Sequence, residues 1–213
     1  SVKTCVGGIV VAALLAFVVM LSACDVLGGS PELIAGPGYF ATIQETIDAS
    51  SSGDTVVVLP GTYYENIDFG GKNITVRSAT FQELDDLSFD YSSGFDIVAE
   101  TVIDGRGSGS VVTFENGETE ATISGFTIRN GEYGVSVLRS SQATIADNVI
   151  INNTGGGIYV YVTNTAPSPS RATVTGNTIS NNASSTGAGI LLSYLAEATI
   201  ENNTISGNTA TNI

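Results

Sequence analysis

The chain has no histidine and no tryptophan, and its charged residues are few and unbalanced. Only 13% of the 213 residues are charged, with 21 acids against 7 bases. Nucleic-acid binding requires clustered Lys and Arg that neutralise phosphates, and the sequence contains no basic stripe. We therefore expect no nucleic-acid partner. The acidic surface suits cations or neutral glycans better than polyanions.

Low charge combined with 42% hydrophobic residues also excludes a disordered chain. The 25 glycines are typical of many short strands joined by tight turns. A chain of this length can form one large domain or two small ones.

Cysteine is scarce, and both copies lie near the start of the chain. Lys3 precedes an apolar run over residues 6–21, which is short for a membrane-spanning helix of about 20 residues. A basic start and a short apolar core are typical of a secretory signal peptide. The run ends in Leu21-Ser22-Ala23-Cys24, which resembles the lipobox of bacterial lipoproteins. The resemblance implies a lipoprotein signal peptide over residues 1–23, with a plain signal peptide or a membrane anchor as the alternatives.

Lipidation at Cys24 predicts a membrane anchor, because each buried CH₂ of an acyl chain contributes about 0.8 kcal/mol. Cys5 leaves with the signal peptide, so the mature chain has no thiol pair for a disulfide. Residues 24–38, with their Gly-Gly and Pro-Gly breaks, are expected to be a tether. We expect a monomer in the bacterial cell envelope, on the extracytoplasmic side of a membrane.

One short phrase, Ala-Thr-Ile or Ala-Thr-Val, returns four times in the last third of the chain. It begins at residues 121, 143, 172 and 198, so the spacings are 22, 29 and 26 residues. A period of this length indicates a solenoid, in which neighbouring units stack because none can bury its apolar side alone. We expect three short strands per coil, with alternate residues pointing inward and coils about 4.8 Å apart.

Alignment on this phrase produces two regular columns. The first is predicted to be core and contains Ile128, Ile150, Ile179 and Ile205. The second is predicted to be a structural ladder in a turn, where each amide bonds the coils above and below, and contains Asn148, Asn177 and Asn203. Neither column is expected to catalyse a reaction.

The folded region opens with a predicted helix and an apolar strand. Thr42-Ile43-Gln44-Glu45 fits a capping box, in which the Thr42 side chain and the Glu45 side chain bond reciprocally to the backbone. A short amphipathic helix over about residues 42–50 follows from this box. The next apolar run, Thr55-Val56-Val57-Val58-Leu59, is typical of a strand in a parallel sheet.

These residues resemble the first coils of bacterial right-handed parallel β-helix proteins of the pectin-lyase-like superfamily. The similarity is carried by Ala41-Thr42-Ile43-Gln44-Glu45-Thr46-Ile47-Asp48-Ala49, Gly53-Asp54-Thr55-Val56, Pro60-Gly61-Thr62-Tyr63 and Glu65-Asn66-Ile67, and continues in Val102-Ile103-Asp104-Gly105 and Gly125-Phe126-Thr127-Ile128. It covers residues 39–213 and implies an all-β fold, a three-sheet right-handed parallel β-helix whose opening helix caps the cylinder. It implies no single activity, because this scaffold hosts lyases, hydrolases, esterases, epimerases, adhesins and stalks.

The sequence stops inside a coil, at Asn212-Ile213. Solenoids need capped ends, so we expect a C-terminally incomplete fragment. Under the alternative of a lyase or epimerase, its catalytic coils are partly missing.

The strand after each recurring glycine predicts an apolar cluster on the outer face of the cylinder. Alternation places Tyr159 and Tyr161 outward, with Leu138 and Leu191 beside them on the neighbouring coils. The resemblance implies that this sheet floors the substrate groove of pectate-lyase-like enzymes. Two interpretations stay open: the tyrosines stack on sugar rings, or the insertion at residues 163–170 covers them.

A long interruption over residues 79–100 carries acids among aromatic residues. Its candidate calcium ligands are Asp85, Asp86, Asp90 and Asp96. Their spacing does not match an EF-hand loop. The alternative is that the aromatics pack the loop onto the cylinder while the acids stay solvated.

No catalytic set is predicted. A glycosidase needs two carboxylates at a controlled separation, but the acids of the repeats, Glu132, Asp147, Glu197 and Glu201, share no column. The resemblance adds that polygalacturonase-type enzymes carry a His-Gly motif, which a chain without histidine cannot supply. Candidate bases for a polysaccharide lyase are Arg129, Arg139 and Arg171, and none has an acidic cluster beside it in the sequence.

The sequence thus predicts an exported, lipid-anchored β-helix that contacts extracellular or cell-envelope polysaccharide. Two alternatives stay open: a cation-dependent polysaccharide lyase or epimerase, and a structural surface stalk or adhesin.

Overall fold

The computed structural model of the chain describes residues 32–163 and 166–210. The predicted signal peptide, the lipidation at Cys24 and residues 24–31 of the predicted tether lie outside the described residues. The predictions made for them remain predictions.

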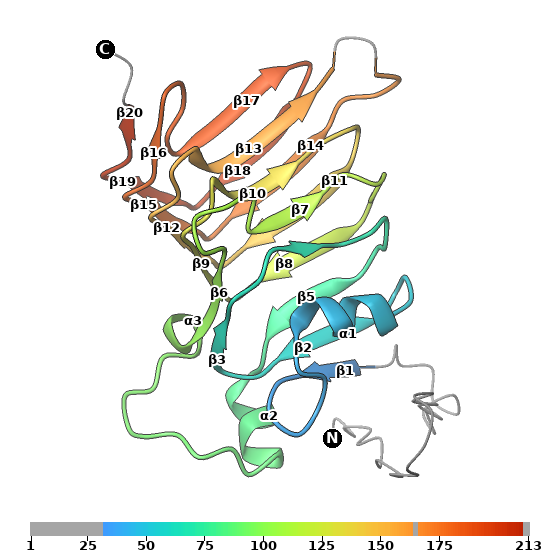
Figure 1. Cartoon of the computed structure of the whole chain (residues 1–213), viewed down its shortest axis with the longest axis vertical. Coiled ribbons are helices and arrows are strands. Elements are labelled where there is room, and N and C mark those ends of the chain that lie inside the picture. Colours follow the sequence, from blue (N-terminus) through green and yellow to red (C-terminus); the bar gives the residue numbers. More distant parts are fainter. Residues whose placement is uncertain (1–31, 164–165, 211–213) are drawn as a thin grey trace.

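Short strands wind into a solenoid in which successive coils stack along the long axis of the molecule (Figure 1). The strands form three sheets, which we call A, B and C. The chain passes from sheet A to sheet B to sheet C and then begins the next coil, and the strands of neighbouring coils pair in parallel. This is the parallel β-helix with three sheets that the repeat predicts.

Within the described residues, sheet A has seven strands, sheet B has six and sheet C has five. Sheet A comprises β1 (Glu32–Ala35), β2 (Thr55–Val58), β5 (Thr75–Ser78), β8 (Ala121–Ser124), β11 (Gln142–Ala146), β14 (Arg171–Thr175) and β18 (Glu197–Glu201). Sheet B comprises β3 (Gly61–Tyr63), β6 (Thr101–Asp104), β9 (Thr127–Arg129), β12 (Val149–Ile151), β15 (Thr178–Ser180) and β19 (Thr204–Ser206). Sheet C comprises β4 (Ile67–Asp68), β7 (Val112–Phe114), β10 (Tyr133–Val137), β13 (Gly156–Val162) and β17 (Ile190–Tyr194), and a further pair joins β16 (Ala183–Ser184) to β20 (Thr209–Ala210).

The core runs through the middle of the solenoid and is filled by inward-pointing aliphatic side chains. The predicted isoleucine column is in register across sheet B, and its first three members are fully buried. The last member, Ile205, is 48% exposed. The first three isoleucines therefore pack between coils, as expected for stacked units that share one core.

The recurring glycines are required because the backbones of neighbouring coils approach closely. A Cβ atom on Gly157 would lie 2.6 Å from the carbonyl oxygen of Gly189 and 2.6 Å from Cγ2 of Ile179. A Cβ on Gly134 would lie 2.5 Å from Cγ2 of Ile150. Only a residue without a side chain fits where the chain enters sheet C.

The predicted asparagine column forms a continuous ladder of hydrogen bonds. Nδ2 of Asn148 donates to Oδ1 of Asn177 (3.2 Å), and Nδ2 of Asn177 donates to Oδ1 of Asn203 (3.0 Å). Nδ2 of Asn177 also donates to the carbonyl oxygen of Ile145, one coil back (2.8 Å). The amides thus bond to the coils on both sides.

A second ladder, which the sequence analysis missed, runs along the turn between sheets B and C. Nδ2 of Asn153 donates to Oδ1 of Asn182 (2.9 Å), and Nδ2 of Asn182 donates to Oδ1 of Asn208 (3.0 Å). The residue before each of the first two, Asn152 and Asn181, has φ of 57° and 55°. In each Asn-Asn pair, therefore, the first residue adopts the left-handed turn conformation and the second forms the ladder hydrogen bond.

The predicted opening helix is present as α1 (Ile43–Ala49) and packs against β1, β2 and β4. Ile43 and Ile47 are buried in the main core, so α1 covers the end of the cylinder. The capping box is half formed: Oγ1 of Thr42 accepts the Glu45 N–H (3.0 Å). The first two N–H groups of the helix are satisfied from another segment: the Glu65 carboxylate accepts the N–H groups of Ile43 (2.9 Å) and Gln44 (3.0 Å).

No helix in the described part of the chain is long and apolar enough to cross a membrane.

The end of the predicted tether differs from expectation. Residues 32–35 form β1, which pairs with β2 over its whole length. Leu33 and Ala35 are buried, so burial of these apolar side chains outweighs the Gly and Pro breaks that follow at residues 36–38. The described solenoid therefore begins before residue 39.

The interruption between β5 and β6 folds over the outside of the cylinder and contains α2 (Phe81–Asp86) and α3 (Ile97–Glu100). Leu84 is fully buried in a small outer core together with Val57 and Leu59, whose side chains lie outside the main core. The aromatic side chains that pack against this outer core are Phe89, Tyr91 and Phe95. The loop is thus packed onto the cylinder by its aromatics.

Candidate functional site

A row of four tyrosines crosses sheet C in the part of the chain that the structure describes. Tyr133 stacks on Tyr159, with ring centroids 4.8 Å apart and planes inclined by 19°. Tyr159 stacks on Tyr161 at 5.7 Å and 26°. Tyr161 meets Tyr194 edge to face at 5.3 Å and 84°. We call these four side chains the tyrosine row.

The two predicted members of the row lie where strand alternation places them. Along β13, Ile158, Val160 and Val162 are buried, while Tyr159 and Tyr161 are half-buried on the outer face. Of the two predicted leucines, Leu191 is the cross-strand partner of Tyr159 and is partly buried. Leu138 is also partly buried and lies just after β10, where its N–H donates to the Phe114 carbonyl (2.7 Å).

Both ends of the row, Tyr133 and Tyr194, differ from the pattern of outward residues that alternation predicts for β13. Tyr133 pairs in register with Gly156, and a Cβ atom on Gly156 would lie 3.5 Å from Cδ1 of Tyr133. The ring of Tyr133 therefore lies over backbone that has no side chain and can reach Tyr159. The run Gly155-Gly156-Gly157 was the signal in the sequence that an aromatic ring of the neighbouring coil needs this space.

Tyr194 was missed for a different reason. It pairs in register with the buried Val162, so strict alternation predicts an inward side chain. Its φ of 60° breaks the strand conformation at the last residue of β17, and the side chain is 67% exposed. A left-handed backbone at a strand end cannot be read from periodicity alone.

The described residues of the insertion, 163 and 166–170, leave Tyr159 and Tyr161 partly exposed. Its described part is fastened through the main chain: Oγ of Ser170 donates to the carbonyl oxygen of Tyr161 (2.8 Å), and Oγ of Ser140 donates to that of Ser168 (2.6 Å). Tyr159 and Tyr161 both stay partly exposed. The interpretation in which this insertion covers them therefore has no support from their exposure.

The phenols of Tyr133 and Tyr159 remain protonated at ordinary pH. Burial raises the pKa of Tyr159, and the neighbouring Tyr133 and Tyr161 raise it further. Burial also raises the pKa of Tyr133, with a contribution from the carboxylate of Glu132. Each phenol can thus donate one hydrogen bond and accept others.

A hollow of about 540 Å³ opens beside Tyr133, along the turns that join sheet B to sheet C. Glycines keep its wall free of side chains, and hydroxyl groups and one carboxylate supply polar contacts. It is lined by Gly107, Gly109, Glu132, Tyr133, Thr154, Gly155, Ser184 and Ser185. We call the tyrosine row and this hollow together the tyrosine face.

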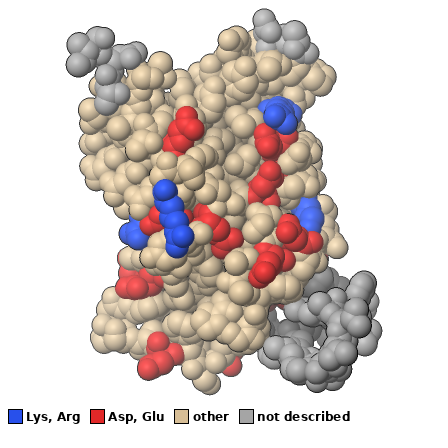
Figure 2. Space-filling model, viewed as in Figure 1, with Lys and Arg blue, Asp and Glu red and all other residues tan. Residues whose placement is uncertain are grey.

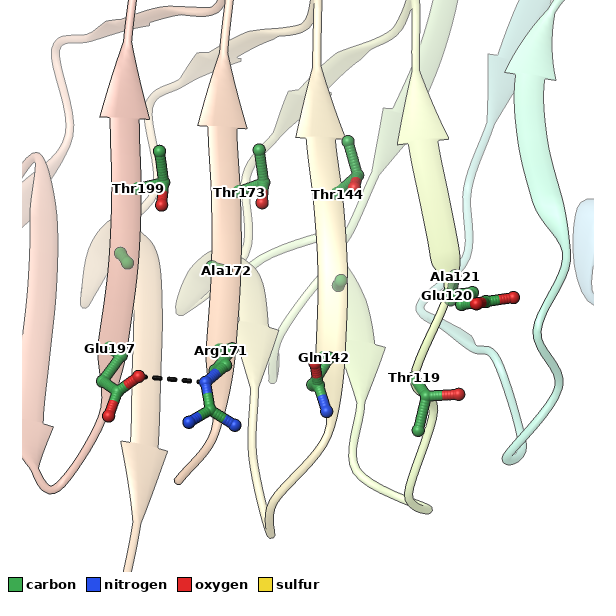
Figure 3. A pocket seen from close by; sticks show the side chains of 12 residues that line it. Thr119, Glu120, Ala121, Gln142, Thr144, Arg171, Ala172, Thr173, Glu197 and Thr199 are labelled. Carbon is green, nitrogen blue, oxygen red and sulfur yellow. Dashed lines mark hydrogen bonds and ion pairs between the residues drawn. The ribbon is translucent and has the colours of Figure 1, made fainter. Parts of the chain in front are cut away.

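A second hollow, of about 330 Å³, lies on the outer face of sheet A (Figure 3). Thr144, Thr173 and Thr199 form a column along it, in register from strand to strand. An ion pair between Arg171 and Glu197 (2.9 Å) crosses two neighbouring strands at its other side (Figure 3). Exposed β-branched residues are what sheet strands favour, and no aromatic side chain lines this hollow. It is a weaker candidate than the tyrosine face.

The arginines considered as lyase bases all have acidic partners. Arg129 pairs with Asp104 (2.9 Å) and Arg139 with Glu115 (3.5 Å), in addition to the pair that Arg171 forms with Glu197. In the view of Figure 2, the basic side chains likewise lie next to acidic ones, and most of the surface carries no charge. Each of the three candidate bases therefore has a carboxylate within ion-pair distance.

The four aspartates considered as calcium ligands do not converge. Asp85 accepts a hydrogen bond from the Tyr91 hydroxyl (2.5 Å), Asp86 accepts from Gln82 (3.0 Å), and Asp96 caps the N-terminus of α3. Asp90 is exposed. In residues 32–163 and 166–210, no three acidic, Cys or His side chains are grouped to hold a metal ion. The acids of this loop therefore serve here as caps and solvated groups, and calcium binding by them stays a prediction.

Comparison with models of protein families supports the fold. The model of a family described as "Right handed beta helix region" matches residues 110–213, which is just under half of the chain. Among solved structures, the pectin methylesterase from Aspergillus niger is similar at 13% sequence identity, covering 86% of this chain and 88% of that one, with a TM-score of 0.29. No match was found among curated proteins. The chain is a right-handed parallel β-helix.

Proposed function

We propose that this right-handed parallel β-helix binds neutral polysaccharide at the tyrosine face. The observation that carries the proposal is the row of partly exposed tyrosines beside an open hollow lined by hydroxyls. Aromatic rings offer apolar area to the C–H groups of a sugar, and phenol, Ser and Thr hydroxyls exchange hydrogen bonds with sugar hydroxyls. A site with both kinds of group suits a carbohydrate.

The stacking within the row decides how its members contact a sugar. The rings of Tyr133, Tyr159 and Tyr161 cover one another, so they offer mainly edges and hydroxyls. Tyr194 is 67% exposed and stands at the end of the row, so it offers ring surface. The proposal therefore assigns ring stacking to Tyr194 and hydrogen bonding to the inner tyrosines, which refines the expectation that Tyr159 and Tyr161 both stack on sugars.

Charge favours a neutral chain over a polyuronate. The whole chain has a formal net charge of −14, and the carboxylate of Glu132 lines the hollow. A polyuronate would bring further negative charge to this surface, where Arg129 and Arg139 are already paired with acids. Like charges repel, so the acidic surface disfavours a polyuronate. We therefore place neutral glycans before uronates.

The proposal extends to location. The similarity of residues 1–24 to a lipoprotein signal supports an exported, lipid-anchored protein that contacts polysaccharide at the cell envelope. Membrane fractionation after globomycin treatment, which blocks lipoprotein signal cleavage, tests this part separately from binding. Accumulation of an uncleaved form is expected. Unchanged processing contradicts the lipid anchor.

Binding is tested by electrophoresis of the full chain through gels that contain xylan, mixed-linkage β-glucan, galactomannan or polygalacturonate. We expect at least one neutral polymer to retard the protein, and the Tyr159→Ala, Tyr161→Ala double variant to migrate faster in that gel. Retardation by polygalacturonate alone, or by no polymer, contradicts the proposal.

A further inference from the structure

A further hollow, of about 490 Å³ and lined by tyrosines, lies at the N-terminal end of the solenoid. It is formed by the loop between β1 and α1, with residues 36–42, and by residues 60–65 around β3. Tyr39 and Tyr64 line it and are 37% and 56% exposed. Both rings therefore have surface that a ligand can contact.

Neighbouring side chains separate the structural tyrosine of this hollow from the available ones. Tyr63 is 9% exposed, and its hydroxyl donates to the carbonyl oxygen of Leu59 (2.9 Å). Tyr64 instead carries the guanidinium of Arg106 over its ring, with Cζ 4.3 Å from the centroid. This cation–π contact fixes the ring at the surface without burying it. Tyr64 is therefore ordered before any ligand arrives.

One turn, residues 105–110 between β6 and β7, joins the hollow at Tyr39 and Tyr64 to the hollow beside Tyr133. Arg106 of this turn contacts Tyr64, while Gly107 and Gly109 line the hollow beside Tyr133. Nδ2 of Asn66 donates to the carbonyl oxygens of Ser108 and Ser110 (both 2.8 Å), which ties the turn to the coil of Tyr64.

The same turn is also tied to the coil of Tyr133. The Glu132 N–H donates to the Gly109 carbonyl (2.7 Å), and the Val111 N–H donates to the Tyr133 carbonyl (2.9 Å). Tyr64, Arg106 and Glu132 each follow a strand of sheet B and precede a strand of sheet C, so they stack along one corner of the solenoid. Two coil spacings, about 10 Å, separate the coil of Tyr64 from that of Tyr133.

We infer that the hollow at Tyr39 and Tyr64 is a second contact for the same polysaccharide, so that one linear glycan lies along this corner, parallel to the solenoid axis. The inference rests on the proposed function. It adds that the ligand is a chain of several sugars and that recognition depends on chain length. A short oligosaccharide occupies only the hollow at Tyr133, and a longer one also reaches Tyr64.

Calorimetric titration of the full chain with xylobiose, xylohexaose, cellobiose and cellohexaose tests the inference. We expect a hexasaccharide to bind at least fivefold more tightly than the disaccharide of the same sugar. Tyr64→Ala is expected to weaken hexasaccharide binding about five- to tenfold, the range that one aromatic contact supplies, and to leave disaccharide binding unchanged. Tyr133→Ala is expected to weaken both.

Phe81→Ala is the matched control, because Phe81 is 47% exposed and lies outside both hollows. Melting temperatures of all variants establish that each is folded. Equal affinity for two and six sugars, or a hexasaccharide affinity that Tyr64→Ala leaves unchanged while Tyr133→Ala lowers it, overturns the inference and leaves the proposed function intact. No binding of any oligosaccharide by the wild-type chain contradicts both.

Discussion

Tyr133 and Tyr159 stack with centroids 4.8 Å apart, although the strand register places Gly156, and not Tyr159, opposite Tyr133. The contact is diagonal between neighbouring coils and exists because Gly155 and Gly156 offer no side chain to fill the space. Glycine in one coil thus determines the position of an aromatic ring in the coil before it. The tyrosine row is a property of stacked coils and not of a single strand.

Replacing Asn177 by Ala is expected to destabilise the solenoid by roughly 2–3 kcal/mol, because buried backbone groups of the preceding coil and the Asn203 side chain of the following coil lose their partners. Oδ1 of Asn177 accepts the Asn148 N–H (3.0 Å), and its Nδ2 donates to Ile145 (2.8 Å). Urea denaturation followed by circular dichroism measures the change. Asn116→Ala is the control, since Asn116 is exposed, and equal midpoints for the two variants would contradict the ladder's role.

Gly157→Ala is expected to lower stability by about 1–3 kcal/mol through overpacking, because the added methyl meets the Gly189 carbonyl at 2.6 Å. The backbone there is not in the left-handed region, so crowding alone is tested. The shift of the thermal midpoint provides the measurement. Retention of the wild-type midpoint would show that neighbouring coils can separate freely at this point.

The carboxyl of Asp104 predicts an acid-dependent loss of stability. Burial raises the pKa of this group, but hydrogen bonds from the Arg106 backbone and the Arg129 and Asn130 side chains outweigh burial and hold the pKa below its ordinary value. Because the folded pKa is the lower one, the stabilisation is fully present above the unfolded pKa of about 3.9 and is lost as pH falls through the folded value.

Thermal midpoints of the wild type and Asp104→Asn between pH 7 and pH 2 test this expectation. The variant should be less stable at pH 7, and the difference should shrink below about pH 4. Asp90→Asn is the control, because Asp90 is exposed. A difference that stays constant over this whole range would contradict the ionic role of Asp104.

Calcium is expected to leave the melting temperature unchanged at concentrations of a few millimolar. The loop aspartates have separate partners, and a ligand that binds only the folded state would raise the melting temperature. Calorimetry with and without EDTA measures this. A rise that disappears in Asp85→Asn, Asp86→Asn would restore the metal interpretation of the loop.

Much of the scaffold follows from the sequence because its physical cause is periodic. The Ala-Thr-Ile phrase and the Ile and Asn columns determine strand spacing, register and the first ladder. The second ladder is less visible, since Asn152-Asn153 and Asn181-Asn182 each hold one turn residue and one ladder residue. The sequence alone does not show which asparagine of a pair is the turn residue and which is the ladder residue.

The aperiodic parts could not be predicted in the same way. Helix α2 begins at a full capping box formed by Thr80 and Glu83, inside a segment interpreted only as a packed or metal-binding loop. Tyr194 faces outward because of a single positive φ at a strand end. These features depend on contacts between distant segments or on one backbone angle, and neither leaves a repeating pattern.

The most direct test of the central claim is the intrinsic tyrosine fluorescence of the full chain during titration with soluble xylan, β-glucan or galactomannan. The chain has no tryptophan and eight tyrosines, so the emission reports on tyrosine alone. The account predicts a saturable change with at least one polymer that is abolished in Tyr133→Ala, Tyr194→Ala and retained in Phe81→Ala. Saturable binding that persists in the double variant, or no change with any of the three, would contradict it.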